Sequence, residues 1–388
     1  MNILLDFLPF QSAEGVGGAA SFAKAVSDEV IRKKSASTKL FAICDSTIPV
    51  GKQYNYKEYA EQNAIVLLDL SASTLAQHIA EQHIDLLFIA IGQFYARYPL
   101  DGIKCKTIMF IHDIWDVESC DNLIDLTIHD KLAEPPLQWT KRMLNIVLGR
   151  YKKRKQRIYQ HIMPLYSAPN TTAYTVSEYT KFSLKYYFPE LNSREIRICY
   201  SPAKDATMFP EIENKTLSQL ITGNKQYLLM LAANRMQKNP HTLLKVFKRL
   251  FIDYPNLHLL TLKYGHSIHP QHIDIPFLTD SDLEHAYKHA HALVFGSYFE
   301  GFGYPPIEAL RHGTPTVASN VTSIPEILGK AGIYFSPFYP ADLYRALNSV
   351  LQERDRYQEA ISQRYAEITH RQKSDLNNLV SEILCLQQ

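Results

Sequence analysis

Features that mark secreted, membrane-spanning and nucleic-acid-binding proteins are scarce in this chain. Its five cysteines show no CxxC pair or other paired spacing, which favours reduced thiols in a cytosolic protein over a disulfide framework. No apolar run approaches the ~20 residues that a membrane-spanning helix needs. The start, MNILLDFLPF, lacks the basic stretch of a signal peptide, so we expect no secretory leader. We therefore expect a cytoplasmic protein, either free or attached peripherally to the inner face of the membrane.

An excess of charge of either sign is also lacking. Lysine and arginine total 41 against 39 aspartate and glutamate residues, which leaves a net charge of +2. Such a balance provides no bulk positive field to attract nucleic acid, and no nucleic-acid-binding module is recognisable. A hydrophobic content of 46% with 21% charged residues is typical of a globular protein. We therefore expect no nucleic-acid partner.

What the chain does contain is a series of short apolar runs that alternate with helical segments. This alternation predicts an α/β protein with parallel sheets covered by helices on both faces. A length of 388 residues exceeds one ordinary core and indicates two domains. The expected strands are Ile3–Phe7, Leu40–Cys44, Ala64–Leu68, Leu86–Ile91, Thr107–Ile111, Tyr174–Val176, Ile196–Cys199, Tyr227–Leu231, Leu257–Lys263, Ile273–Leu278, Ala292–Phe295, Thr316–Ser319 and Ile333–Phe335.

The most informative stretch is ALVFGSYFEGFGYPPIEAL, residues 292–310. It reads as a buried strand, a turn with three glycines and a helix that starts at two prolines, which suit the first helical positions. The free N–H groups of such a helix start lie at the end of the strand and can hold phosphate. Carboxylates beside a phosphate cradle repel it, but they can accept hydrogen bonds from sugar hydroxyls. The pair Glu300 and Glu308 therefore predicts a nucleotide-sugar site, whereas either acid alone fits a structural role better.

This segment, continued as RHGTPTVASNVTSIPEILGKAGIYFSP, resembles the signature of retaining GT-B glycosyltransferases of the family 4 (group 1) type. Glu300 and Glu308 match the two acids of the family motif, and the similarity extends from about residue 227 to 351. The resemblance implies a GT-B architecture of two Rossmann-like domains facing a central cleft. We expect an acceptor-binding domain over 1–203, a nucleotide-sugar-binding domain over 204–365, and a C-terminal helix over 366–388 that packs back on the first domain.

The resemblance also implies roles for individual residues of the second domain. Glu308 would bind the ribose hydroxyls, and Glu300 the hydroxyls of the transferred sugar. Two cations in the turn after Tyr227–Leu231 would stabilise the leaving diphosphate in place of a metal ion, so we expect no metal and no cofactor. The remaining donor-binding residues would be Phe277 and Leu278, against the nucleotide base, and Gly301, Phe302 and Gly303 of the loop. The two cations are Arg235 and Lys238.

In the first domain, two strand ends are candidates. Gly17 and Gly18 lie in a Gly-rich turn before a helical pattern, and the matching glycines of the resembled family line the cleft near the diphosphate. His112 and Asp113 follow the strand Thr107–Ile111. A lone histidine is more often structural, but the family holds a cleft histidine here, so we assign His112 to catalysis and to substrate contact. Asp113 is assigned to acceptor binding.

A basic helical segment spans Trp139 to Met163, with an apolar stripe between its charges. A helix of this kind can lie on anionic lipid, so residues 141–157 are a candidate membrane surface. A core-packed helix with a solvated basic face fits the pattern equally well.

Two patterns that suggest metal are interpreted as structural. Asp280–Asp282 is a DxD triplet, but Ser281 and Glu284 fit a helix capping box. The histidines between 266 and 291 lack the i, i+4 spacing and the cysteine partners of a zinc site.

The sequence therefore predicts an enzyme that transfers a glycosyl group from a UDP- or GDP-sugar to a glycan or lipid-linked acceptor hydroxyl, with retention of configuration. Assembly of cell-envelope polysaccharide or glycolipid is the expected context. The alternatives are a GT-B sugar-nucleotide epimerase or hydrolase, a nicotinamide oxidoreductase, and a non-catalytic, membrane-associated GT-B subunit.

Overall fold

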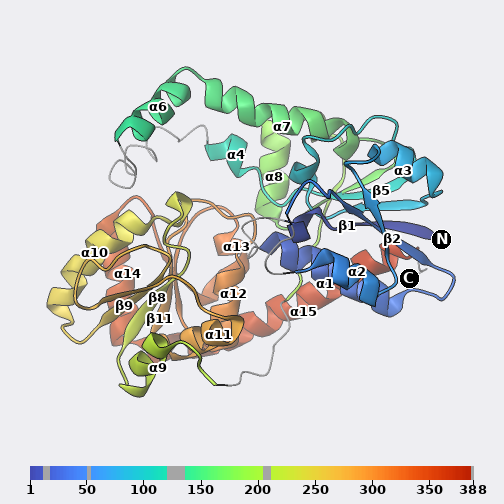
Figure 1. The fold of residues 1–388 in the computed structure, drawn as a ribbon. Helices are drawn as coiled ribbons and strands as arrows, with labels where there is room; N and C mark the ends of the chain where they lie inside the picture. Colours follow the sequence, from blue (N-terminus) through green and yellow to red (C-terminus); the bar gives the residue numbers. More distant parts are fainter. Residues whose placement is uncertain (12–17, 50–53, 120–135, 204–210, 386–388) are drawn as a thin grey trace. The chain divides into compact units, whose positions relative to one another are not determined.

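The structure is a computed structural model that describes residues 1–11, 18–49, 54–119, 136–203 and 211–385. The chain forms two compact units (Figure 1). The first comprises Met1–Asp121, Asn145–Lys204 and Arg371–Gln388, and the second comprises Asn122–Leu144 and Asp205–His370. Each unit is built on its own parallel sheet, as the alternation of apolar runs and helices predicts.

The sheet of the first unit has seven parallel strands in the order β3-β2-β1-β4-β5-β6-β7. Its strands are β1 (Asn2–Asp6), β2 (Lys39–Cys44), β3 (Val66–Asp69), β4 (Leu86–Ile89), β5 (Lys106–Phe110), β6 (Thr171–Thr175) and β7 (Ile196–Ile198). The helices of this part of the chain are α1 (Gly18–Lys33), α2 (Tyr56–Gln62), α3 (Leu75–Glu81), α4 (Trp115–Glu118), α6 (Pro136–Val147), α7 (Arg150–Tyr166) and α8 (Glu178–Tyr187).

The sheet of the second unit has six parallel strands in the order β10-β9-β8-β11-β12-β13. Its strands are β8 (Tyr227–Met230), β9 (His258–Leu262), β10 (His272–Ile275), β11 (Ala292–Phe295), β12 (Thr316–Ser319) and β13 (Gly332–Phe335). The helices are α9 (Lys215–Thr222), α10 (Pro240–Asp253), α11 (Asp280–His289), α12 (Tyr304–Arg311), α13 (Ile324–Leu328), α14 (Pro340–Gln352) and α15 (Gln358–Ile383), whose residues from Arg371 onward belong to the first unit.

Both sheets reverse their strand order once, which creates a topological switch point. The reversal falls between β1 and β4 in the first unit and between β8 and β11 in the second. Connections on the two sides of such a point leave in opposite directions, so a crevice opens beyond the carboxyl ends of the two strands and ligands bind there. The loops that follow these four strands are therefore where a site is expected.

The hydrophobic cores follow from strands that are buried on both faces. In the second unit, β8 and β11 are fully buried, and they place alternate side chains against two helix layers. Leu243 and Phe247 of α10 pack on one face together with Leu347 of α14. Leu310 of α12 and Tyr287 of α11 pack on the other. This burial fixes the strand ends from which the site loops start.

Two local predictions are wrong. The single helix expected over Trp139–Met163 is two helices, because Gly149 adopts a left-handed φ of 64° between α6 and α7. The capping box at the start of α11 is formed by Thr279 and Asp282, not by Ser281 and Glu284. Ser177 is the N-cap of α8, since its hydroxyl accepts the Thr180 N–H.

Within the described ranges, no helix is both long and apolar enough to cross a bilayer.

Candidate active site

In the second unit, the loops after β8 and β11 meet at the switch point. Register pairs Leu229 with Leu293, so the two strands end at the same edge of the sheet. The Tyr298 N–H then donates to the Gln237 carbonyl at 2.8 Å, which joins the two loops directly. Two predicted site residues, Lys238 and Glu300, are brought together by this contact and form an ion pair.

The Lys238–Glu300 pair is largely shielded from water. Its side chains are 14% and 16% exposed, so the attraction between them is screened much less than at an open surface. Glu300 Oε1 also accepts a hydrogen bond from the Ser297 hydroxyl at 2.6 Å, while the Lys238 ammonium lies 4.8 Å from the centre of the Phe295 ring. No described residue donates a hydrogen bond to Glu300 Oε2. One carboxylate oxygen is thus held by the protein, and the other is left for a ligand hydroxyl.

The backbone of the signature loop is held from the next crossover, after β12. Glu300 donates its N–H to the Thr322 hydroxyl at 3.1 Å. The Ser323 hydroxyl donates to the carbonyl oxygens of Glu300, at 2.9 Å, and Phe302, at 3.1 Å. These hydroxyls pin both sides of Gly301 and fix the direction of the Glu300 side chain. Their roles were not predicted, because each depends on a hydrogen-bond partner that lies more than 20 residues away in the chain.

The helix that follows the loop begins as its prolines predict. Gly303 is the N-cap of α12 and has φ of 110°, a left-handed conformation that favours glycine. No side chain caps this helix end at Gly303. The prolines at 305 and 306 carry no N–H, so any backbone N–H contact to an anion must come from the residues that precede them. Phe302 is buried and packs edge-on against Tyr304 at 5.6 Å, and this contact supports the turn. The strand, turn and helix around residues 301–303 are thus formed as predicted, and their binding of phosphate stays a prediction.

Glu308 is buried inside α12, with 7% of its surface exposed. The Tyr287 hydroxyl of α11 donates to Glu308 Oε2 at 2.5 Å. Burial and the adjacent Glu308 carboxylate hold the pKa of Tyr287 well above its usual value, so its hydroxyl stays protonated and remains a donor. A buried carboxylate held in this way has a fixed direction, which is what recognition of a diol requires.

The remaining predicted donor residues, Arg235, Phe277 and Leu278, differ in their exposure. Arg235 precedes the 3-10 helix η5 (Met236–Lys238) in the β8 loop and is partly exposed. Phe277 is 59% exposed after β10, where a planar base could stack on it. Leu278 is buried in the core beside α11, so the side chain that was expected to touch the base packs inward instead.

In the first unit, Gly17 lies outside the described residues, and Gly18 opens α1 after the β1 crossover. His112 and Asp113 follow β5 as predicted. The Asp113 carboxylate accepts the Trp115 N–H at 3.1 Å, and its carbonyl accepts from Gln93 at 2.7 Å, so Asp113 has a clear structural role in the loop.

The His112 ring packs between aromatic residues. It lies edge-on to Phe22 at 4.6 Å and tilted against Phe110 at 5.9 Å. Burial lowers the pKa of His112 to about 4, and the ring is hydrogen-bonded to the Ala90 backbone. Its Nε2 is buried and has no hydrogen-bond partner among the described residues. His112 is therefore a neutral imidazole at neutral pH, with Nδ1 bonded to Ala90 and Nε2 left to accept a hydrogen bond.

The DxD triplet has a structural function. Asp282 caps α11 through Thr279, and its Oδ1 accepts the backbone N–H groups of Glu213 at 2.9 Å and Asn214 at 3.1 Å. Its oxygens therefore already accept hydrogen bonds from the protein. Glu284, the expected capping partner, instead pairs with Arg311 and His312 of the region around the α12 C-terminus.

Comparison with known proteins agrees with this geometry. Residues 211–367 match the family model for glycosyl transferases group 1. The matched residues lie within the second unit. The chain as a whole has the GT-B fold: a sucrose-phosphate synthase from Thermosynechococcus elongatus covers 100% of it with a TM-score of 0.68 at 14% identity. WaaG, a glycosyltransferase involved in lipopolysaccharide biosynthesis, covers 99% of the chain with a TM-score of 0.61 at 14% identity.

Several sequence relatives of the chain are named as bacterial mannosyltransferases. The chain is 21% identical to the serotype-specific mannosyltransferase WbdA of Escherichia coli over 92% of its own length and 45% of that protein. It is 27% identical to the O-antigen chain mannosyltransferase RfbU of Salmonella typhimurium over 48% of its own length and 52% of that protein. The chain thus spans about half the length of these curated relatives.

Proposed function

We propose that this protein is a retaining glycosyltransferase that moves a sugar from a nucleotide-sugar to an acceptor hydroxyl during assembly of a cell-envelope polysaccharide. The observation that carries the proposal is the Lys238–Glu300 pair at the β8/β11 switch point, beside the uncapped start of α12. This arrangement offers a cation and the backbone of the signature loop to a diphosphate, and a carboxylate oxygen to a sugar hydroxyl.

The proposed residue roles are those that the resemblance to the family implies, and this geometry supports them. Glu308, fixed by Tyr287, binds the ribose hydroxyls, and Glu300 binds a hydroxyl of the transferred sugar through Oε2. Lys238, with Arg235 and the α12 N-terminus, stabilises the negative charge that grows on the leaving diphosphate. The Lys238 ammonium has three N–H donors, so it can keep Glu300 and still contact a phosphate oxygen. We propose that these groups replace a metal ion.

Retention is proposed on the chemistry that the site offers. A front-face reaction, in which the leaving phosphate takes the proton of the acceptor hydroxyl, requires charge stabilisation and orientation rather than an enzymic nucleophile. Lys238 and the α12 N-terminus supply the charge stabilisation, and Glu300 supplies the orientation of the sugar. His112, a neutral imidazole, is proposed to accept a hydrogen bond from a substrate hydroxyl through Nε2.

The donor sugar proposed first is mannose, because the relatives named WbdA and RfbU are mannosyltransferases and the second is named for the O-antigen chain. The acceptor is then a growing glycan or its lipid-linked form. Structural neighbours such as HepE from Anabaena have been solved with UDP and glucose, so a UDP-sugar is the comparison donor for the test.

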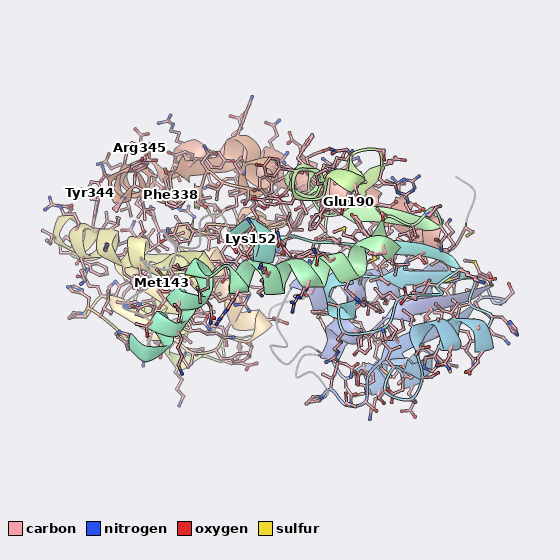
Figure 2. All side chains as sticks on the ribbon, turned by 90° about the horizontal axis from the view of Figure 1, so that it is seen from above. Met143, Lys152, Glu190, Phe338, Tyr344 and Arg345 are labelled. Atoms are coloured by element: carbon pink, nitrogen blue, oxygen red, sulfur yellow. The ribbon has the colours of Figure 1, made fainter. Side chains whose placement is uncertain are left out.

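A membrane surface is the second proposed partner, since a lipid-linked acceptor would lie there. The end of α6 and the turn residue that follows it expose three apolar side chains, Leu144, Val147 and Leu148, which are 57%, 67% and 49% exposed. The next helix begins with three exposed cations, here named the α7 basic end (Figure 2, where Met143 marks α6 and Lys152 marks α7). Apolar and cationic groups in sequence suit the interface of an anionic bilayer. The α7 basic end comprises Arg150, Lys152 and Lys153.

The proposal is tested first by thermal shift with UDP, GDP, ADP and NAD, without metal and then with magnesium. A ligand at a hundred times its dissociation constant should stabilise the protein by about 2.7 kcal/mol. A metal-independent shift with one nucleoside diphosphate supports the donor site. A shift with NAD alone would favour an oxidoreductase and contradict the proposal.

Transfer is then measured with GDP-mannose and UDP-glucose against a hydroxyl-bearing glycan acceptor. Formation of an α-linked product from an α-configured donor, followed by NMR of the anomeric proton, supports retention. Conversion of the sugar nucleotide without added acceptor would indicate an epimerase or hydrolase instead.

A further inference from the structure

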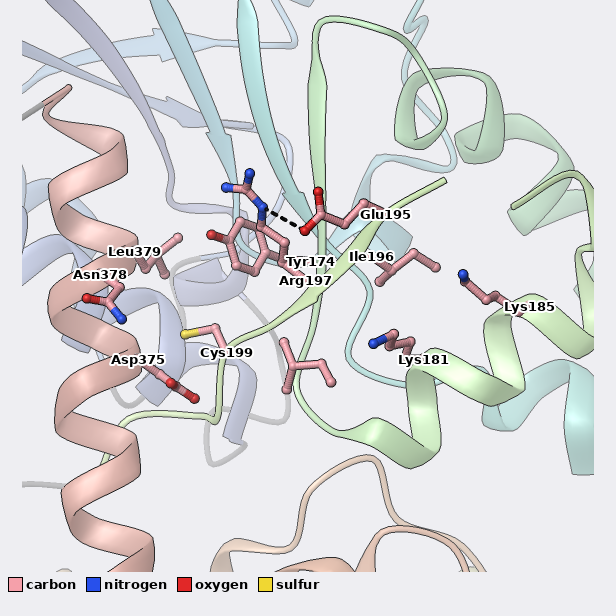
Figure 3. A pocket seen from close by; sticks show the side chains of 11 residues that line it. Tyr174, Lys181, Lys185, Glu195, Ile196, Arg197, Cys199, Asp375, Asn378 and Leu379 are labelled. Carbon is pink, nitrogen blue, oxygen red and sulfur yellow. Dashed lines mark ion pairs between the residues drawn. The ribbon is translucent and has the colours of Figure 1, made fainter. Parts of the chain in front are cut away.

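A groove in the first unit lies away from the residues described above. It follows the free edge of β7, the last strand of the seven-stranded sheet, and has a volume of about 500 Å³. Helix α8 forms one wall and the C-terminal part of α15 forms the other (Figure 3). This edge groove is lined by Tyr174, Lys181, Lys185, Glu195, Ile196, Arg197, Ile198, Cys199, Asp375, Asn378 and Leu379.

The floor of the edge groove is the unpaired side of a β-strand. Cys199 donates its N–H to Thr175 of β6, which sets the alternation along β7. In a parallel pair, successive residues direct both of their backbone groups to opposite sides. Arg197 and Cys199 therefore face β6, whereas the N–H and C=O groups of Ile196 and Ile198 face the groove. Such an edge is a template for one further strand.

The carboxylates of α15 beside the edge groove are already matched by arginine, whereas Glu195 of the groove lining is 78% exposed and lies 3.7 Å from Arg197, which it shares with Glu382. Glu382 of α15 accepts from Arg197 at 2.8 Å, from the Tyr174 hydroxyl at 2.8 Å and from Thr172 at 3.0 Å. Asp375 accepts the Tyr200 N–H at 2.9 Å and lies 3.6 Å from Arg371. The α15 wall thus carries little uncompensated negative charge.

The α8 wall is different, because it carries two lysines with weak partners. Lys181 is 3.6 Å from Glu178, whose side chain is 47% exposed. Lys185 reaches only the Asn192 carbonyl at 3.4 Å, and no carboxylate of the described residues lies within 4 Å of its ammonium. Both side chains extend from α8 toward the strand (Figure 3). This wall therefore favours an anionic partner.

Spacing decides which anionic partner fits. Residues four apart on a helix have Cβ atoms about 5–6 Å apart, and alternate residues of a strand are about 6.6 Å apart. Acidic residues at positions n and n+2 of an added strand would therefore reach Lys181 and Lys185 together. A free phosphate could use the lysines, but it would be repelled by the carbonyl oxygens of Ile196 and Ile198. A peptide strand pairs with the carbonyl and N–H groups alike.

We propose that the edge groove binds an extended acidic peptide segment with an acid-x-acid pattern, which pairs with β7 as an eighth strand and places its carboxylates on Lys181 and Lys185. The intervening side chain points to the other face of the sheet, toward Asn378 and Leu379. The main chain contributes hydrogen bonds that any peptide could make, and the lysine pair selects for charge.

The test is fluorescence anisotropy of the full chain with the peptide Ser-Glu-Val-Glu-Ser-NH₂, which carries fluorescein on its N-terminal amine, at low salt. Two further versions are N-methylated, one at both glutamate amides and one at the valine and second serine amides. Because amides alternate in direction along a strand, one version should bind at least about tenfold more weakly and the other should bind like the parent. Equal tolerance of both methylated peptides would show attraction by charge alone and would overturn the proposal.

Variants locate the contact. K181E/K185E should weaken the acidic peptide by about tenfold and should bind the likewise labelled peptide Ser-Lys-Val-Lys-Ser-NH₂ in its place. The matched control K104E/K106E reverses two exposed lysines elsewhere in the same unit and should change neither affinity. Ile198→Pro removes a groove-facing N–H and leaves the bonds to β6 in place, so it should also weaken the peptide.

Three results would refute strand binding. They are no saturable binding up to millimolar peptide, unchanged binding by K181E/K185E, and displacement by inorganic phosphate at the peptide's own concentration, which would assign the groove to a small anion. If no saturable binding is found, the charges on α8 and β7 serve instead to keep the free edge of β7 from pairing with another strand.

Discussion

Replacement of Glu300 by glutamine is the sharpest perturbation of the proposed donor site. The amide keeps the shape of the side chain and an oxygen that can accept from Ser297 and Lys238. It removes the negative charge from the position of Glu300 Oε2, which is proposed to bind a sugar hydroxyl. A hydrogen bond to a charged group contributes about 1.5–3 kcal/mol, so kcat/KM for transfer should fall by about 10- to 150-fold.

Nucleotide affinity should stay the same in Glu300→Gln, because the proposed contact is with the sugar and not with the diphosphate. The assay is therefore a pair of measurements: transfer kinetics with the complete donor, and calorimetric titration with the nucleoside diphosphate alone. Loss of affinity for the diphosphate with unchanged turnover would refute the assigned role. Wild-type kinetics would remove Glu300 from the site altogether.

A matched control separates chemistry from stability. Glu284 pairs with Arg311, and their side chains are 13% and 14% exposed, close to the values for Glu300 and Lys238. Glu284→Gln removes the charge of a similarly shielded pair that lies outside the proposed site. Both variants should lose comparable stability in a thermal scan, but only Glu300→Gln should lose transfer activity. An equal loss of activity in Glu284→Gln would mean that the effect is structural.

Three further outcomes are expected. Glu308→Ala should weaken a ribonucleoside diphosphate by about 10- to 150-fold and leave its 2′,3′-dideoxy analogue unchanged in calorimetry, and a retained preference for ribose would contradict its role. Because the folded-state pKa of His112 is lowered to about 4, stability should fall as pH drops from 6.5 to 4, by at most about 3 kcal/mol, and His112→Gln should flatten this slope in urea titrations. Neutralising the three residues of the α7 basic end should weaken binding to anionic vesicles on the order of 100-fold at low salt, whereas no change in a sedimentation assay would favour a solvated basic face. Its control variant neutralises three exposed lysines of the first unit, Lys39, Lys104 and Lys106.

The strands could be predicted because burial on both faces leaves a direct mark in the sequence. Apolar runs locate every strand of both sheets, and Ala292–Phe295 and Thr316–Ser319 agree with β11 and β12 at both ends. The α/β class follows from their alternation with helices. The GT-B fold required the resemblance as well, since alternation alone does not give the order of strands in a sheet.

Local patterns failed where two choices were chemically equivalent. Thr279 with Asp282 and Ser281 with Glu284 both satisfy the capping-box pattern. The structure uses the first pair, and Asp282 there also accepts the Glu213 and Asn214 N–H groups. Those partners lie 69 and 68 residues away, so no local pattern contains the choice. The break at Gly149 was missed for a related reason: glycine is tolerated inside a helix, and its left-handed conformation is visible only in the structure.

The donor site could likewise be predicted only where the information is local in sequence. The residue types of EGFGYPPIE predict what the loop can bind, but not what holds it. Lys238 and Glu300 are 62 residues apart and meet only because β8 and β11 are neighbours at the reversal of strand order. Tyr287, which directs Glu308, is 21 residues away on another helix. In sequence its ring resembles any core aromatic.

Asn239 links these parts into one assembly. It is buried, has φ of 57° and caps α10, a combination that asparagine tolerates better than most residues. Its side-chain oxygen also accepts from the Tyr298 hydroxyl at 2.8 Å, and its amide donates to the Pro337 carbonyl at 3.1 Å. One residue thus fixes the turn that carries Lys238 to the loop that carries Glu300. The precision of the proposed site therefore depends on a neighbour that needs no contact with the substrate.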